Sequence, residues 1–307
     1  MTVTIAPTPR KRRNQRSSWE EQPTRIGSTL KGIVLTLLAL SVLFPLWVIL
    51  ITSLSSREML ADAGGFVVIP RGIDFSAYET IFAGGAVTRA LWISTMVTVI
   101  GTTVALTVTV LAAYGLSRPQ TLGNRWLLAY FLLPFLIYPP LVPKYLVVTG
   151  LGLKNTIWAL ILPSAISVFN LVVIRGFFQS IPQELLDSAK IDGAGEFRIL
   201  WRIVLPLSKA VVAVIGLFYA VGYWNVWFDA LLFIDRNDLY PIQRVLQSYL
   251  LAGQAPNTSG GSVGNTMPPS EAIKMAVVIL TVLPIVAVYP FIQRHFIKGV
   301  LIGAVKG

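Results

Sequence analysis

The chain has 307 residues, of which 54% are apolar and 13% are charged, and its mean hydropathy is +0.70. This composition excludes an ordinary soluble protein and indicates a polytopic membrane protein. The chain has no cysteine and one histidine, His295. Disulfide frameworks and Cys/His metal sites are therefore excluded, and histidine-based catalysis is not expected.

Six charge-poor runs are long enough to cross a bilayer core of about 30 Å, which needs about 20 helical residues. We predict an all-α membrane protein whose membrane domain covers 32–294, with spans at about 32–54, 90–116, 126–148, 155–174, 210–234 and 275–293. The third run contains four prolines and Lys144. We expect that span to be kinked and packed inside the protein.

The positions of lysine and arginine predict the orientation, because cytoplasmic loops carry an excess of these residues. Most of the 25 basic residues fall in the N-terminal segment 1–31, a polar island at 175–209 and the tail 295–307. We therefore place these segments in the cytoplasm of a multi-pass cell-membrane protein. The run RKRRNQR at 10–16 could bind nucleic acid or anionic lipid. Because it lies beside a span, we interpret it as a signal that sets the orientation in the membrane, and no nucleic acid partner is expected.

Two sizeable loops are predicted outside the cytoplasm. The loop 55–89 contains Pro, Gly and aromatic residues that suggest a compact cap. The loop 235–270 is rich in Gly, Ser, Asn and Pro and should be mobile, the plain alternative being a solvated linker.

The island predicts two short helices around a turn. Ser180 and Gln183 fit a capping box, so a helix can start near Ile181. Gly193 closes it, because glycine permits either a left-handed cap or a close backbone approach that a side chain would block. The segment 196–204 has apolar residues at helical spacing and leads into the fifth span. Composition alone would also allow a surface helix lying along the lipid headgroups.

The spacing Asp187-Ser188-Ala189, then Gly193, then Ile203-Val204-Leu205-Pro206 resembles the EAA loop of ABC importer permeases. Segments that resemble the carbohydrate, MalG-like branch are 152–156, 180–185, 191–194, 201–207, 223–225, 293–299 and 303–307. The ending YPFIQRHFIKGVLIGAVKG is similar to the oligosaccharide-importing, LplC/YtcP-like group. Two departures are Asp-Ser-Ala in place of Glu-Ala-Ala, and Val226 where an acidic or polar residue is common.

The resemblance implies one permease of a type I ABC importer for a sugar, in which two homologous permeases form the pathway and two cytoplasmic ATPases drive it. An extracytoplasmic solute-binding protein would deliver the sugar, and the 181–194 helix would couple to an ATPase. No GxxxxGK[ST] phosphate loop occurs. We therefore expect no enzyme activity and no cofactor in this chain, with ATP and Mg held by the partner ATPase. The implied coupling residues are Glu184, Asp187, Ser188, Ala189, Asp192, Gly193, Ala194, Ile203, Leu205 and Pro206.

Polar and aromatic residues interrupt the fifth span, where Asn225 and Asp229 are four apart and would share a helix face. Sugars stack on aromatic rings and bind amides and carboxylates, although aromatic residues near an interface can also form a simple belt. For Asn170 the alternative is a hydrogen bond between helices. The candidate pathway residues are Asn170, Tyr223, Trp224, Asn225, Trp227 and Asp229.

By the same resemblance, the loop around Gln254, Thr258 and Asn265 would reach into the docked binding protein. The rival interpretation is a secondary transporter or channel that works without ATPases. Such proteins place ionisable residues near the bilayer midplane. The middles of the predicted spans contain none, which disfavours the rival.

Overall fold

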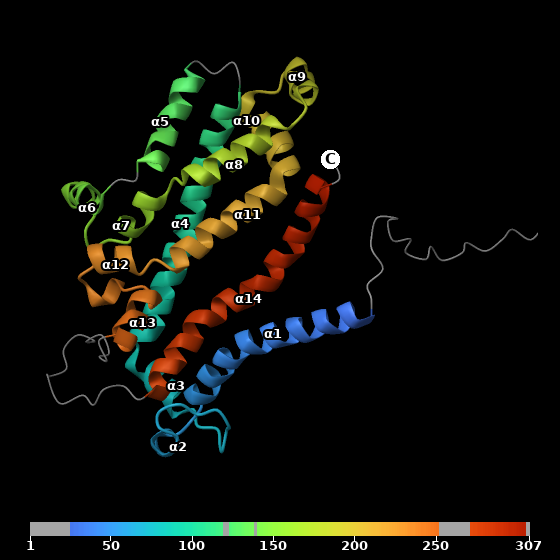
Figure 1. The fold of residues 1–307 in the computed structure, drawn as a ribbon. Helices are drawn as coiled ribbons and strands as arrows, with labels where there is room; N and C mark the ends of the chain where they lie inside the picture. The colour runs from blue at the N-terminus through green and yellow to red at the C-terminus, as the bar shows by residue number, and fades with distance from the viewer. Residues whose placement is uncertain (1–24, 119–122, 138–139, 252–270, 305–307) are drawn as a thin grey trace, which may run out of the picture. The chain divides into compact units, whose positions relative to one another are not determined.

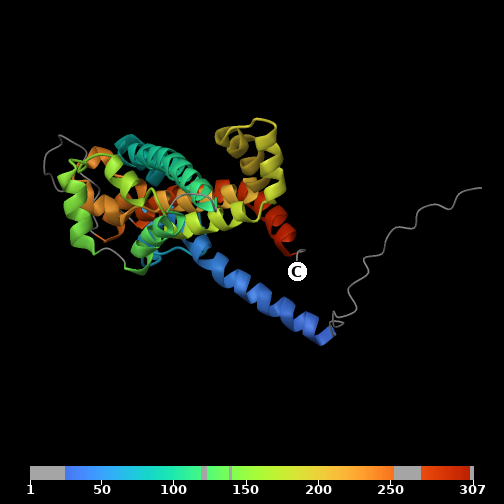
Figure 2. The same ribbon diagram turned by 90° about the horizontal axis from the view of Figure 1, so that it is seen from above.

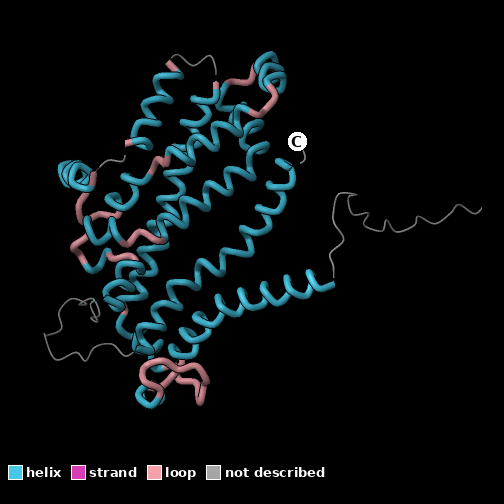
Figure 3. The backbone as a smooth tube through the Cα atoms, viewed as in Figure 1, coloured by secondary structure: helices cyan, strands magenta, loops and turns pink. Residues whose placement is uncertain are grey.

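The computed structural model describes residues 25–118, 123–137, 140–251 and 271–304, with side chains described up to Tyr289 (Figures 1 and 3). These residues are mostly helical and include no strand. The chain divides into two units, residues 1–47 and 48–307. The predicted loop residues Gln254, Thr258 and Asn265 lie outside the described part of the chain.

Helix α1, Arg25–Ser53, contains the described part of the first unit. Every described side chain of that unit, from Ile26 to Trp47, is exposed, and most of them are apolar. Apolar side chains along a whole helix are stable in lipid, where the backbone bonds are satisfied within the helix itself. The prediction of a first membrane span is consistent with this helix.

Within the described part of the chain, four helical runs are long and apolar enough to cross a membrane, and two bent pairs raise the number to six by length and composition. The four runs are Ile26–Ser53, Ala86–Ser117, Glu196–Trp224 and Glu271–Tyr289, of which the second is α4 and the last belongs to α14, Glu271–Ala304. This agrees with the all-α prediction of six spans.

The two bent pairs correspond to the third and fourth predicted spans. Helices α5, Asn124–Leu136, and α6, Leu141–Gly150, lie at 117° to each other, so the predicted kink is a sharp break. The fourth predicted span, 155–174, is divided into α7, Trp158–Ile161, a 3₁₀ turn η1, Leu162–Ser164, and α8, Val168–Gln179. The bend is 51°, and the Ser167 hydroxyl caps α8 by accepting from the Asn170 N–H.

The fifth span starts and ends earlier than the predicted 210–234. Helix α10, Glu196–Ile199, continues through a π-helical turn η2, Leu200–Val204, into α11, Leu205–Trp224. Pro206 has no N–H to donate, and the wider turn before it lets the helix continue. The helix ends where Asn225 caps it, so α12, Phe228–Phe233, is a separate helix.

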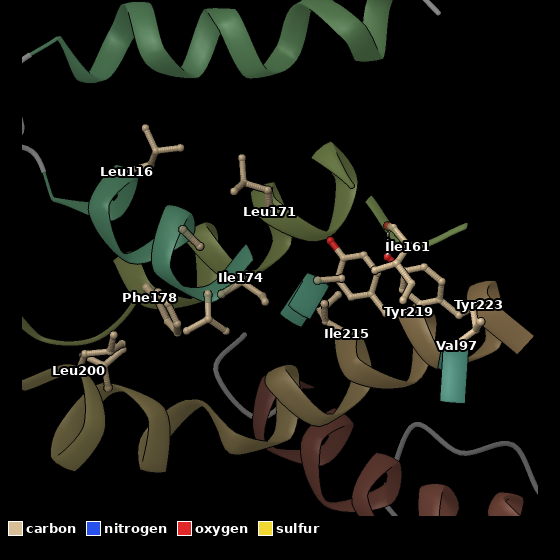
Figure 4. Close-up of a cluster of buried hydrophobic side chains, with 14 of the residues drawn as sticks. Val97, Leu116, Ile161, Leu171, Ile174, Phe178, Leu200, Ile215, Tyr219 and Tyr223 are labelled. Carbon is tan, nitrogen blue, oxygen red and sulfur yellow. Dashed lines mark hydrogen bonds between the residues drawn. The ribbon is translucent and has the colours of Figure 1, made fainter. Parts of the chain in front are cut away.

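The main core of the second unit lies between α4, α8 and α11, as Figure 4 shows. Val97, Leu171, Ile174 and Ile215 are fully or almost fully buried there. Close packing of these aliphatic side chains gives the three helices many favourable van der Waals contacts. This core holds α8 and α11 in place, and both helices supply residues to the pocket described below.

A second cluster joins the segment after α1 to the start of α14. It contains α2, Arg57–Asp62, α3, Ser76–Gly84, and α13, Ile242–Leu251. The Val67 N–H donates to the Thr52 hydroxyl at 3.2 Å, which fixes the loop between α2 and α3. The compact arrangement predicted for 55–89 is confirmed.

Helix α13 was not predicted, since residues 235–270 were expected to be an irregular loop. Its buried residues Ile242, Val245 and Tyr249 recur at helical spacing, which was the available signal. The remaining described elements are η3, Asn237–Leu239, and α9, Gln183–Ile191. Figure 2 shows α9 and the start of α10, in yellow, projecting from one end of the second unit.

Candidate functional site: a polar pocket and a projecting helix

A pocket of about 540 Å³ lies where α8 begins and α11 ends. Five of the six candidate pathway residues line it, namely Asn170, Tyr223, Asn225, Trp227 and Asp229. Further lining residues include Lys144, Ser164, Ser167, Phe218, Tyr219 and Phe228. The volume and the mixture of aromatic and polar groups are typical of a site for a small organic ligand.

An ion pair crosses one wall of the pocket. The Lys144 Nζ atom of α6 lies 2.7 Å from the Asp229 Oδ1 atom of α12, and the two side chains are 25% and 15% exposed. The ammonium group also lies 5.8 Å from the centre of the Phe233 ring, which stacks on Tyr145. In the sequence, Lys144 stands out only as a charged residue within the third predicted span. Its partner is 85 residues away, and no local pattern indicates such a pairing.

The end of α12 is tied to the turn before α7. The Asn155 N–H donates to the Phe233 carbonyl at 2.9 Å, and the Asp235 N–H donates to Asn155 Oδ1 at 2.6 Å. Lys154 and Asp235 form an exposed ion pair at 2.9 Å. The hydrogen bond from Lys154 lowers the pKa of Asp235, and the same bond raises the pKa of Lys154. These contacts fix the short helix that carries Asp229.

Two buried tyrosines of α11 line the pocket. The Tyr219 hydroxyl lies 2.6 Å from the Thr109 hydroxyl of α4 and accepts from the Ser167 N–H at 3.0 Å. The Tyr223 hydroxyl donates to the Ile161 carbonyl at 2.9 Å, as can be followed in Figure 4. Both hydroxyls form hydrogen bonds with backbone groups at the break between α7 and α8, where the regular helical hydrogen bonds are interrupted.

Asn225 and Asn170 are the two asparagines that line the pocket. Asn225 Nδ2 donates to the Val221 carbonyl at 2.9 Å, and its Oδ1 accepts from Gln243 of α13 at 3.0 Å. Asn170 is only 5% exposed, and among the described residues its side-chain amide has no hydrogen-bond partner. Because Asn170 lines the pocket, its amide can form a hydrogen bond with a ligand or water there.

One sequence-based expectation about this region is wrong, and one candidate residue does not line the pocket. Asn225 and Asp229 do not share a helix face, because α11 ends at Trp224 and Asp229 belongs to α12. They nevertheless line the same pocket. Trp224 lies outside it: its indole N–H donates to the Thr281 carbonyl of α14 at 3.2 Å, and its ring lines a separate, mostly apolar hollow.

Helix α9 carries most of the predicted coupling residues. Its end has the two hydrogen bonds of a Schellman motif, from Gly193 N–H to the Lys190 carbonyl at 3.0 Å and from Ala194 N–H to the Ala189 carbonyl at 2.9 Å. Gly193 has φ +76°, so the predicted left-handed cap is confirmed. Apart from the neighbouring residues of the chain, nothing lies within 4 Å of the position that a Cβ would take. Within this chain, the need for glycine therefore comes from the backbone conformation and not from lack of space.

The start of α9 differs from the prediction. Ser180 does not form a capping box, because its hydroxyl donates to the Phe177 carbonyl at the end of α8. Gln183 instead donates to Asp187 at 3.1 Å, one turn along the helix. Pro182 is the N-cap residue, and its ring restricts φ to a value that suits this boundary.

The coupling residues differ in exposure. Ala189, Ala194, Ile203 and Leu205 are partly buried, whereas the other predicted residues are exposed: Glu184, Asp187, Ser188, Asp192, Gly193 and Pro206. Four large apolar side chains nearby are also exposed, and these are Leu185, Ile191, Phe197 and Trp201. Exposed apolar side chains beside charged ones are typical of a surface that contacts another protein.

No group of three or more His, Cys, Asp or Glu side chains that could hold a metal ion occurs among the described residues.

The family described as "Binding-protein-dependent transport system inner membrane component" matches residues 105–302. Protein LplC of Bacillus subtilis (strain 168) is 44% identical over 265 residues, covering 86% of this chain and 90% of that protein. The polygalacturonan/rhamnogalacturonan transport system permease protein YtcP of the same organism is 43% identical over 243 residues, covering 79% and 85%.

A solved structure has the same fold. It is described as a bacterial ABC transporter involved in the import of the acidic polysaccharide alginate, and the chain matches it with a TM-score of 0.81 and 27% identity, covering 91% of this chain and 100% of that one. The predicted resemblance to ABC importer permeases is confirmed. Since the family pattern covers well over half of its residues, the chain belongs to the family of binding-protein-dependent transport system inner membrane components.

Proposed function

We propose that this chain is the permease subunit that forms one half of the sugar pathway of an ATP-driven importer, with an oligosaccharide as substrate. A second homologous permease would form the other half, two ABC ATPases would supply the driving force, and an extracytoplasmic solute-binding protein would deliver the sugar. Family membership supports this proposal, as does the name of one relative, a polygalacturonan/rhamnogalacturonan transport system permease protein.

The observation that carries the pathway assignment is the pocket at the broken fourth span. Trp227, Phe218 and Tyr223 offer aromatic surface, while Asn170, Asn225 and the Lys144–Asp229 pair offer hydrogen-bonding groups. A sugar has apolar C–H faces and polar hydroxyl edges, so it can use both kinds of group. Broken helices at membrane depth also occur where the backbone lines a cavity.

Helix α9 is the proposed coupling helix and would contact an ATPase in the cytoplasm. Both chain termini would lie on the same side of the membrane. Its projection from the second unit and its exposed apolar and charged side chains support this role (Figure 2). ATP-driven movement of α9 would shift the helices that line the pocket. Coupling of this kind requires a helix bundle with two states that ATP and sugar bias from different ends.

Reconstitution of the assembled transporter tests the proposal. Trp227→Ala should weaken the apparent affinity for sugar uptake by about tenfold, as expected for one lost aromatic contact. Trp92→Ala is the matched control, because Trp92 is an exposed tryptophan of α4 that does not line the pocket. Both variants should retain the ATPase and the second permease.

Two results would contradict the proposal. One is that the wild-type chain copurifies with no ATPase. The other is that the purified chain alone performs uptake driven by an ion gradient, which would favour a secondary transporter. Equal uptake by the Trp227 and Trp92 variants would remove the pocket from the pathway.

A further inference from the structure

The carboxylate of Glu196 joins three elements at the α9 end of the second unit. Glu196 is the first residue of α10. Its Oε2 atom accepts from the Tyr114 hydroxyl and from Arg118 Nη2, the latter at 3.3 Å, and its Oε1 atom lies 3.1 Å from Lys190 Nζ. Tyr114 and Arg118 belong to the end of α4, and Lys190 belongs to the last turn of α9. One side chain therefore connects α4, α9 and α10.

The groups on the α4 side are held in place independently of Glu196. The Arg118 guanidinium lies over the Tyr114 ring at 4.5 Å from its centre, and it donates to the Tyr114 hydroxyl. The Tyr114 ring also meets the Phe178 ring edge-on, with 6.4 Å between centres. Because Tyr114 and Arg118 are already held in place, their side chains lose little freedom when they bind the Glu196 carboxylate. The carboxylate therefore takes a defined position.

On the α9 side the other contacts with the unit are few. Leu186 is the only buried residue of α9, and Ala189 is partly buried against the same core. The rest of the helix is exposed, including its charged residues. The bond between Lys190 and Glu196 is therefore the polar link by which the described part of α9 is tied to the start of the fifth span.

We propose that Glu196 is a positioning residue that makes α9 move together with the ends of α4 and α10. This inference rests on the proposed role of α9 in contacting the ATPase. Force applied to α9 would reach α4 through Tyr114 and Arg118, and it would reach α11 through the continuous helix that begins at Glu196. Both α4 and α11 extend to the pocket region, where Thr109 and Tyr219 are in contact.

Partly exposed ion pairs contribute little to folding, so the loss of this link should affect coupling more than stability. In the assembled transporter, Glu196→Gln and Lys190→Met should each lower the ratio of ATP hydrolysis with loaded binding protein to hydrolysis without it by at least about fivefold, the lower end of common allosteric couplings. The amount of bound ATPase should stay unchanged. Lys190→Arg retains a charged donor and should keep most of the stimulation.

Two controls separate positioning from other effects. Glu79→Gln makes the same chemical change at an exposed position of α3 and should leave the ratio unchanged. Lys190→Met leaves Glu196 at the start of α10, so any loss it causes does not come from the charge at that helix terminus.

The inference is overturned if Glu196→Gln and Lys190→Met lower the melting temperature but keep the stimulation ratio, which would indicate a purely structural role. It is also overturned if they release the ATPase, which would make these residues part of the docking surface. If wild-type hydrolysis is not stimulated by loaded binding protein at all, the proposed function itself fails, whatever the variants do.

Discussion

Gly101 shows how a single residue sets the distance between two spans. A Cβ at this buried position of α4 would lie 2.9–3.0 Å from ring atoms of Tyr223, closer than real contacts allow. The Tyr223 ring has little freedom to move away, because its hydroxyl donates to the Ile161 carbonyl. The glycine therefore permits α4 and α11 to approach closely beside the pocket.

Gly101→Ala should lower stability by about 1–3 kcal/mol, the usual cost of overpacking, and should also reduce uptake because the Tyr223 ring is displaced. The melting temperature of the purified transporter checks this. Gly176→Ala is the matched control, because no other atom lies near its Cβ position in α8, and it should be neutral or slightly stabilising. Equal melting temperatures for the two variants would show that the Gly101 contact is not close-packed.

At the scale of elements, α9 is a short helix whose end depends on one backbone conformation. Gly193 adopts φ +76°, whereas the nearby Gly195, the N-cap residue of α10, has φ −71°. Neither glycine has atoms near its Cβ position. The two positions therefore differ mainly in backbone conformation, and they provide a matched pair of substitutions.

Gly193→Val should disrupt the end of α9, because a β-branched side chain strongly disfavours positive φ. The protein should still accumulate in the membrane, while uptake and binding-protein-stimulated ATP hydrolysis should fall steeply. Gly195→Val should have a much smaller effect, since valine tolerates the extended backbone there. Normal uptake by the Gly193 variant would mean that α9 is a headgroup-bound helix and not a coupling element.

At the scale of the whole molecule, the distribution of basic residues predicts the orientation in the membrane. Because the chain lacks cysteine, single cysteines can report the side on which each segment lies. With an impermeant thiol reagent on intact cells, Ser17→Cys and Ser188→Cys should be protected and Ser259→Cys should be labelled. Labelling at position 188 from outside would contradict both the orientation and the proposed contact with an ATPase.

The sequence by itself determined the features that depend on composition and short spacing. Apolar runs of hydrocarbon length predicted six spans, because helices satisfy their own backbone bonds in lipid. The motif around Asp187, Gly193 and Pro206 identified the family, and Gly193 was correctly expected in a left-handed cap. These features are readable from sequence because each depends on residues that are neighbours along the chain.

Only the tertiary structure decided how the spans break and which side chains meet. The division of the fourth span, the end of α11 at Trp224 and the pairing of Lys144 with Asp229 all depend on contacts between distant segments. Tyr114 and Glu196 are 82 residues apart, and Thr109 and Tyr219 are 110 apart. Helical periodicity specifies which face of a helix is apolar, but it does not specify which other helix will satisfy a polar group on it.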